Sequence, residues 1–493
     1  MNAATAESAP AMTLTRPDFV IVGAALALLG LIAYLAGRKE KDTRDFFLGG
    51  RSVPTFVATL SFVAAEVSAV SLIGVPAVAY GENWHYLQFF IGSAAARIFI
   101  AFFFIPVFYK HNCTSIYEFL RDRFGAGTEY AGSAFFFITR LLGAGVRLYM
   151  ACLGISVIMG WSLLQSILLF TAVSSALIAF GGIKAAVWTG AFDAVIFYLA
   201  GGLAAGWLFL HIDGGLASVW EIAGRAGRLN VFNFKLDLGD PKTFWAGTAN
   251  ALFLNAAMFG TDQELVQRLL TVRTRRSSQK ALVATILAAL PFLCGYLALG
   301  TLLFVFYQQH GVPTLDSNDK ILSYSVIHTL PAGLKGLLLA AIVLASIDIP
   351  LSSLSTSFVT NLYRPLIHKT GSERHYLWVS RAGIVGFGLI LVLLALCCQS
   401  AQEGLWLAFK IVSVTGGSTL GIFLLGILTK RRSNQANIFA MIVSALTCAS
   451  LLFLSETEVI SLGWSWLIVI GTVETFVIAY LLGPGMESDV PHA

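Results

Sequence analysis

Long apolar runs recur along the whole chain, and short polar connections separate them. Each run has roughly twenty residues or more, enough to cross about 30 Å of hydrocarbon as an α-helix. The runs do not alternate polar with apolar residues, so they do not fit the strands of a membrane barrel. The pattern predicts an all-α membrane protein of about thirteen spans, near residues 18–37, 53–80, 84–108, 129–159, 162–181, 185–211, 243–268, 277–308, 333–363, 377–398, 405–428, 435–455 and 463–483.

Basic residues gather in every second connection, for example Arg38 and Lys39 after the first span and Arg431 after the eleventh. Because cytoplasmic loops carry an excess of Lys and Arg, this alternation predicts an outer N-terminus and a cytoplasmic C-terminus. Residues 1–17 would form an outer tail and residues 484–493 a cytoplasmic tail. These connections explain the net charge of +5, which therefore indicates topology rather than binding to nucleic acid.

The composition is 57% hydrophobic and 12% charged, with a mean hydropathy of +0.78. Soluble domains carry about 25% charged residues, so a single water-soluble core is excluded. The six cysteines and eight histidines lack metal-ligand spacing, and no phosphate-binding glycine loop is present, so ATP is not the expected energy source. The grouped residues of an enzyme are also missing. We expect no enzymatic activity and no cofactor.

Two of the predicted spans, five spans apart, are interrupted by polar residues. The second contains Glu66, Ser68 and Ser71, and the seventh contains Asn255 and Asp262. Broken helices at matching places in two five-helix halves are typical of transporters with inverted repeats, in which unwound backbone faces an ion or a substrate. The expected organisation is a leading helix at 18–37, repeats at 53–211 and 243–428, and two trailing helices within 435–483.

At these positions the sequence resembles the sodium:solute symporter family, which includes sodium-coupled carriers of glucose, proline and sialic acid. Five segments in the family's order carry the resemblance, at residues 45–51, 114–120, 181–189, 260–268 and 346–363. The resemblance implies a LeuT-like fold, with ten core helices after one leading span and before two trailing ones. It also implies sodium-coupled symport by alternating access, with Na⁺ as the coupling ion and the only metal.

The resemblance also implies a sodium site at the first helix break. Sodium binds hard oxygen ligands. Backbone oxygens would come from Ala64, Val67 and Ile342, and a hydroxyl from Ser346. The family often has two adjacent hydroxyl residues here, whereas this chain has Ala345 before Ser346, so Ala345 offers only its carbonyl, or water fills the place. The alternative is that Ser346 bonds only to its own helix.

Some family members hold a second ion with an aspartate at the start of the fifth core helix, where this chain has Gly190. A relocated site would use Asp193, one turn later, and residues of the eighth core helix. The complete candidate set is Asp193, Asp348, Ser352 and Ser353. The simpler expectation is one sodium ion per cycle.

Candidate solute contacts are polar or charged residues inside spans. A charged side chain there costs free energy, so its presence indicates a functional role by default. They are Glu66, Ser68, Ser71, Gln88, Arg147, Asn255 and Lys410. Gln88 and Asn255 match substrate-contact positions of the family, and Met258 and Phe259 match its gating residues. The alternatives are internal pairing of Glu66 with an arginine and simple packing of Met258 and Phe259.

Two departures from the sugar carriers, Leu287 and Phe409, disfavour a sugar. A cation such as Arg147 or Lys410 in a low dielectric favours a carboxylate, so we expect a sialic acid, a monocarboxylate or an amino acid. A sugar symporter, a proton-coupled carrier using Glu66, Asp193 or Asp348, and a channel remain alternatives. The expected partners are the solute, Na⁺ and the lipid bilayer, and a monomer would suffice.

Overall fold

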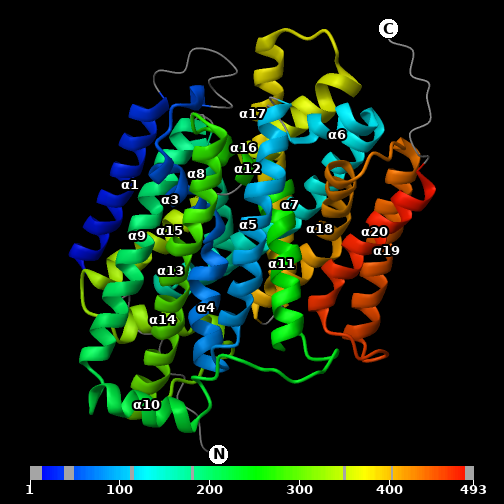
Figure 1. The fold of residues 1–493 in the computed structure, drawn as a ribbon. Coiled ribbons are helices and arrows are strands. Elements are labelled where there is room, and N and C mark those ends of the chain that lie inside the picture. The colour runs from blue at the N-terminus through cyan, green and yellow to red at the C-terminus, as the bar shows by residue number, and fades with distance from the viewer. Residues whose placement is uncertain are drawn as a thin grey trace, which may run out of the picture.

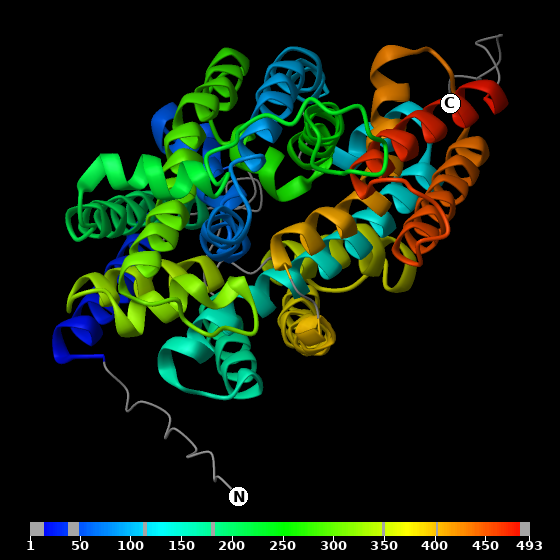
Figure 2. The ribbon, with the colours of Figure 1, turned by 90° about the horizontal axis from the view of Figure 1, so that it is seen from below.

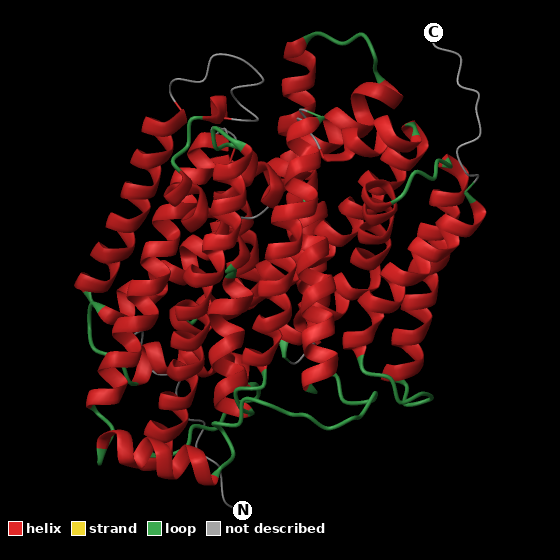
Figure 3. Ribbon diagram, in the orientation of Figure 1, coloured by secondary structure: helices red, strands yellow, loops and turns green. Residues whose placement is uncertain are grey.

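The computed structural model describes residues 14–37, 49–111, 116–178, 183–347, 351–400 and 403–483. Throughout these segments the regular structure is helical, with no strand (Figures 1 and 3). Asp348 and both tails beyond residues 14 and 483 lie outside the described segments. The predicted all-α fold is therefore confirmed for the part of the chain that the structure describes.

Nine of the described helices are long and apolar enough to cross a membrane. They are α1 (Arg16–Gly37), α5 (Tyr86–Lys110), α7 (Ala126–Met159), α9 (Ile183–Leu210), α13 (Arg275–His310), α17 (Glu373–Cys397), α18 (Gly404–Leu428), α19 (Asn434–Glu456) and α20 (Leu467–Leu482) taken together with the 3-10 turn that begins at Trp464. A tenth candidate span is the bent pair α3 (Thr55–Glu66) and α4 (Ala69–Gly81).

The three other predicted spans fall on helices that do not pass the same test of length and hydropathy. They are α8 (Leu163–Ile178), α11 (Phe244–Thr261) followed by α12 (Gln263–Leu270), and α15 (Leu334–Ile347) followed by α16 (Leu351–Ser357) and the π-helix η3 (Phe358–Ile367). Shorter elements include α6 (Ile116–Phe124), α10 (Gly215–Arg225), η2 (Asn318–Lys320), α14 (Ile321–His328) and η5 (Trp464–Trp466). Figure 1 shows α10 and α6 at opposite ends of the bundle, which we call the α10 side and the α6 side.

The first predicted interruption is a sharp break between α3 and α4, which meet at 64°. Val67 and Ser68 have extended backbone angles there, with ψ of 103° and 178°. Ser68 is the N-cap residue of α4, a position that serine favours. The break frees backbone carbonyls in the middle of a span, which is tolerated only where they are buried in protein or line a cavity.

The second interruption lies at Asp262, which ends α11 and begins α12. The Asp262 carboxylate accepts hydrogen bonds from the backbone N–H groups of Glu264 (2.9 Å) and Leu265 (3.3 Å). An aspartate cap satisfies donors that a new helix would otherwise leave unpaired. Asn255, by contrast, lies inside continuous helix, so of the two polar residues only Asp262 marks the break.

Helices α5 and α11, one from each predicted repeat, cross closely at Gly92. A Cβ atom at Gly92 would collide with the Thr248 carbonyl oxygen and lie 2.8 Å from the Leu252 nitrogen. Both obstacles are backbone atoms, which cannot rotate away. A residue without a side chain is therefore needed for α5 and α11 to lie this close.

Gly92→Ala is expected to destabilise the protein by about 1–3 kcal/mol, the usual cost of overpacking. The measurement is the apparent melting temperature of the detergent-purified protein. Gly202→Ala is the matched control, because Gly202 lies on α9 with no atom within 4 Å of the added methyl group. Equal melting temperatures for the two variants would contradict the close crossing.

Candidate functional site

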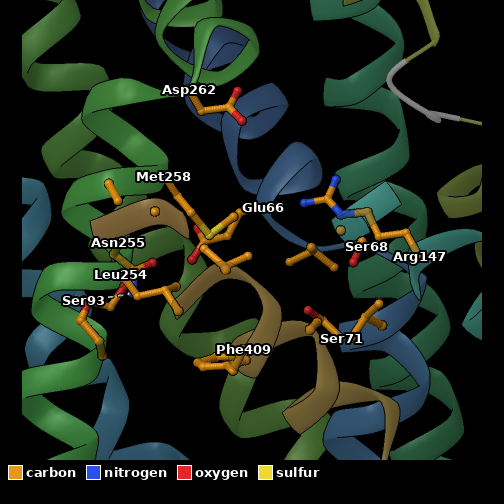
Figure 4. A pocket seen from close by; sticks show the side chains of 18 of the residues that line it. Glu66, Ser68, Ser71, Ser93, Arg147, Leu254, Asn255, Met258, Asp262 and Phe409 are labelled. Carbon is orange, nitrogen blue, oxygen red and sulfur yellow. Dashed lines mark hydrogen bonds between the residues drawn. The ribbon is translucent and has the colours of Figure 1, made fainter. Parts of the chain in front are cut away.

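A cavity of about 200 Å³ lies beside the first helix break. The helices α5, α7, α11, α13 and α18 contribute to its wall together with the α3–α4 junction. Five of the predicted solute contacts line it, as does the predicted gate residue Met258, and Figure 4 shows them around one space. These five are Glu66, Ser68, Ser71, Arg147 and Asn255.

Glu66 forms an ion pair with Arg97, its Oε2 atom lying 2.5 Å from the arginine Nη2. Arg97 is fully buried, and it also donates hydrogen bonds to Ser93 and to Thr285 (2.9 Å). Its guanidinium lies 4.8 Å from the ring centre of Phe259. Internal pairing of Glu66, one of the two sequence-based alternatives, is therefore present, while the carboxylate still borders the cavity.

The residues of α5 that line the cavity recur at helical spacing. Tyr86, Phe90 and Ser93 line the cavity, and Arg97 continues the series at i, i+4, i+7 and i+11, so they share one face. The sequence analysis missed Tyr86, Phe90 and Ser93. The buried charge of Arg97 was the available signal, because the face that holds it must look inward.

Gln88 lies about 200° around α5 from Tyr86, on the opposite face. Its side chain is fully buried and is not part of the cavity wall. The amide donates to the Lys242 carbonyl (2.6 Å) and accepts from the Asn233 N–H (3.2 Å). Gln88 is thus hydrogen-bonded to the segment that precedes α11, and it does not lie with the other candidate solute contacts.

Two further candidates also lie away from the central cavity. Phe259 packs edge to face on Phe62, with ring centres 5.1 Å apart, and is fully buried. Lys410 pairs with Glu456 of α19 (2.7 Å) and lines a second cavity of about 620 Å³ on the α10 side. Helical rotation explains both displacements, because the neighbours Met258 and Phe409 face the central cavity instead.

Five aromatic residues lie between the central cavity and the second one, and we call them the aromatic barrier: Tyr86, Phe89, Trp406, Phe409 and Trp464. Representative ring-centre separations are 5.6 Å for Tyr86 and Trp406, 6.0 Å for Phe89 and Phe409, and 5.7 Å for Trp406 and Trp464. Tyr86, Phe89 and Phe409 line the central cavity, while Trp406 and Trp464 line the second one. The barrier therefore separates the two cavities.

Helix α18 carries Trp406 and Phe409. Its first residue, Gly404, is held at the α10 side by a buried carboxylate. Asp319 of η2 accepts a hydrogen bond from the Gly404 N–H at 2.9 Å. Burial raises the pKa of Asp319, and the bond from Gly404 partly offsets that rise. This contact ties the start of α18 to the segment between α13 and α14.

Toward the α6 side, the cavity wall ends in a network of ion pairs. Arg140 of α7 contacts Asp262 (3.1 Å) and also pairs with Glu264 of α12. Glu264 in turn pairs with Arg268 at 3.3 Å, and Arg268 donates to the Ser61 hydroxyl of α3 at 2.8 Å. These contacts join α3, α7 and the second helix break.

The predicted sodium ligands come from two elements, because Ala64 and Val67 lie at the first break and Ile342, Ala345 and Ser346 lie on α15. The Ser346 hydroxyl is buried and donates to the Ile342 carbonyl at 2.5 Å. This is the bond to its own helix that the sequence analysis gave as the alternative to a sodium ligand, and it joins two of the candidate oxygens. Ala64, Val67 and Ile342 belong to one contiguous core, and Ala345 packs against it.

Only part of the candidate second ion site lies within the described residues. Asp193 is buried in α9, and the Ser353 hydroxyl lies 3.5 Å from the Glu264 carboxylate. Asp348 falls outside the described residues, as does the side chain of Ser352. At Gly190, a Cβ atom would lie 2.8 Å from both Arg268 Nη1 and Ser61 Oγ, so the Arg268 guanidinium occupies the space beside this glycine.

Two interrupted helices around a central cavity that has polar and charged residues in its wall define a secondary transporter, in which solute and ion bind near the middle of the membrane. Residues 46–444 match the model of the sodium:solute symporter family. The chain belongs to this family, and its membership confirms sodium-coupled solute transport at the level of the family.

Individual relatives are identical to this chain at about a quarter of the aligned residues. The sodium-coupled monocarboxylate transporter 2 of Danio rerio is 29% identical over 81% of this chain and 65% of its own length. The sodium/sialic acid symporter NanT of Aliivibrio fischeri is 26% identical over 96% of this chain and 94% of its own. A solved Na⁺-coupled sialic acid symporter, substrate-bound and outward-open, is 25% identical with a TM-score of 0.83, covering 95% of this chain and 99% of its own.

Arg97→Gln is expected to destabilise the protein by about 1.5–3 kcal/mol, because it leaves the partly buried Glu66 carboxylate without its charge partner. Glu66→Gln combined with Arg97→Gln should restore much of that loss. The measurement is a double-mutant cycle of apparent melting temperatures in detergent. Strictly additive effects of the two substitutions would show that the pair is not coupled.

Proposed function

We propose that this chain imports a small organic carboxylate together with one sodium ion, exposing the central cavity alternately to the two sides of the membrane. The observation that carries the proposal is the cavity at the first helix break, with Arg147 and Glu66 in its wall. The α10 side is the outer side in this proposal, as the basic connections predict. The helices α8, α11–α12 and α15–η3 complete thirteen spans.

The carboxylate specificity is supported by the charges around the cavity. Glu66 is paired with Arg97, and Asp262 with Arg140. Arg147 adds a further guanidinium to the wall from α7. A guanidinium binds a carboxylate through two parallel hydrogen bonds. Relatives named for a monocarboxylate and for sialic acid, both carboxylates, fit the same solute class.

Of the two departures from the sugar carriers, one lies in the cavity wall and the other does not. Phe409 lines the cavity, so its departure from the sugar carriers affects the site directly. Leu287 is 78% exposed on the outside of the bundle and cannot influence the solute from there. Phe409 alone therefore disfavours a sugar.

The stoichiometry of one sodium ion is supported at Gly190. The Arg268 guanidinium lies where a side chain at position 190 would be, and a fixed cation disfavours a second cation close by. A second site around Asp193 and Ser353 is the alternative. The single proposed sodium ion would bind oxygens of Ala64, Val67, Ile342, Ala345 and Ser346 at the first break.

Ser346→Ala is expected to weaken sodium activation of uptake about tenfold, equivalent to about 1.4 kcal/mol for one lost ligand. The measurement is solute uptake into proteoliposomes at varied sodium concentration. Ser325→Ala is the matched control, since Ser325 is a buried serine of α14 that likewise donates to a carbonyl of its own helix, that of Leu322. Uptake that ignores an imposed sodium gradient would refute the coupling, and uptake driven by a pH gradient alone would favour a proton-coupled carrier.

Arg147→Gln is expected to weaken solute binding by roughly 10- to 100-fold, because a hydrogen bond to a charged group is worth about 1.5–3 kcal/mol. The measurement is a thermal-shift screen of purified protein, with and without Na⁺, against monocarboxylates, sialic acids, amino acids and neutral sugars. Arg225→Gln is the charge-matched control on the exposed surface of α10. Stabilisation by neutral sugars alone would rule out the carboxylate specificity.

A further inference from the structure

The segment 226–243 crosses the α10 side of the bundle between α10 and α11, and we call it the strap (Figure 2). Near its start, the Asn230 carbonyl accepts a hydrogen bond from the Trp84 N–H at 3.1 Å. Farther along, the Leu238 carbonyl accepts one from the Gly463 N–H at 2.7 Å. The strap therefore joins the connection between α4 and α5 to the connection between α19 and α20.

Glu82 is the residue at which the strap, α4 and α18 meet. It is the C-cap residue of α4. Its two carboxylate oxygens each accept a hydrogen bond from Lys242 Nζ of the strap at 2.8 Å. One of them also accepts from Trp406 Nε1 of α18 at 3.3 Å, and the backbone carbonyl accepts from Arg228 of the strap at 2.7 Å.

Lys242 completes a triangle with the other two side chains. Its ammonium lies 4.9 Å from the ring centre of Trp406, within the range of a cation–π interaction. Each of the three side chains thus contacts both of the others. Each also comes from a different element, namely α4, the strap and α18.

This triangle lies at the aromatic barrier, because Trp406 belongs to both. A solute that moves between the α10 side and the central cavity has to pass Tyr86, Phe89 and Phe409, the barrier residues that line that cavity. Trp406 contacts all three of these rings. A movement of α18 away from α4 and α5 would separate these rings, and the same movement would separate Trp406 from Glu82.

We propose that Glu82 is a latch residue, which keeps the aromatic barrier closed by binding the strap and α18 at the same time. Glu82 does not line the central cavity, so it is a positioning residue that acts through Trp406 and Lys242. The side chains of Glu82 and Lys242 are each 25% exposed. A partly solvated ion pair contributes modestly and can break and re-form, as a contact that opens in every transport cycle must. The inference rests on the proposed alternating access.

The test measures how easily the central cavity is reached from the α10 side. A cysteine introduced by Ser71→Cys in the cavity wall is labelled with a membrane-impermeant maleimide added to that side of sealed vesicles. Labelling of the same protein without the added cysteine is subtracted, because Cys397 is exposed. Glu82→Gln in the Ser71→Cys background is expected to raise the labelling rate about fivefold by loosening the latch.

The control is Glu221→Gln in the same background. It makes the same chemical change in an ion pair on the surface of α10, with Arg225, and is expected to leave labelling unchanged. Trp406→Phe provides a second perturbation, since it keeps an aromatic ring in the barrier but removes the indole N–H together with the five-membered ring that carries it. It should raise labelling about twofold, as expected for the loss of one weak hydrogen bond.

Sodium and solute are absent during labelling, so the readout does not depend on the sodium site or on Arg147. Failure of those two proposals and failure of the latch are therefore distinguishable. Native labelling rates in both Glu82→Gln and Trp406→Phe, in protein that keeps its native melting temperature, would overturn the proposal. Increased labelling in Glu221→Gln as well would overturn it equally, because the effect would then not be specific to the latch.

Discussion

The ion pair between Glu66 and the fully buried Arg97 is the interaction on which the central site depends. A helix can stop in the middle of a membrane only if protein groups satisfy the polar atoms that the break exposes. Glu66 is the last residue of α3, and Arg97 binds it from α5 while also bonding to α13 through Thr285. One guanidinium thus joins the broken helix to two continuous ones, and the cavity forms beside this junction.

The interruptions themselves could be predicted from the sequence, because Glu66, Ser68 and Asp262 are too polar for an ordinary lipid-facing span. Which face of a helix each polar residue occupies could not. Gln88 and Phe259 match functional positions by resemblance, but α5 and α11 are rotated so that Phe90 and Met258 face the cavity instead. That rotation depends on tertiary packing, such as the close crossing at Gly92, which a list of polar residues in one chain does not reveal.

The two ends of the cavity are closed by different kinds of interaction. The α10 side has aromatic rings, one of which is bonded to the Glu82 carboxylate, whereas the α6 side has the paired charges of Arg140, Asp262 and Glu264. Ring contacts depend mainly on apolar burial, and ion pairs are sensitive to water and salt. The two sides can therefore respond differently to the same bound solute, which alternating access requires.

Arg268, which lies beside Gly190, also has an electrical consequence. A side chain tethered to α12 stays with the protein throughout the cycle, so its positive charge is not delivered across the membrane. One sodium ion moving with one singly charged carboxylate carries no net charge. A transmembrane potential supplies about 2.3 kcal/mol per elementary charge for each 100 mV, and a neutral pair gains none of it. Accumulation of the solute would then depend on the sodium concentration gradient alone.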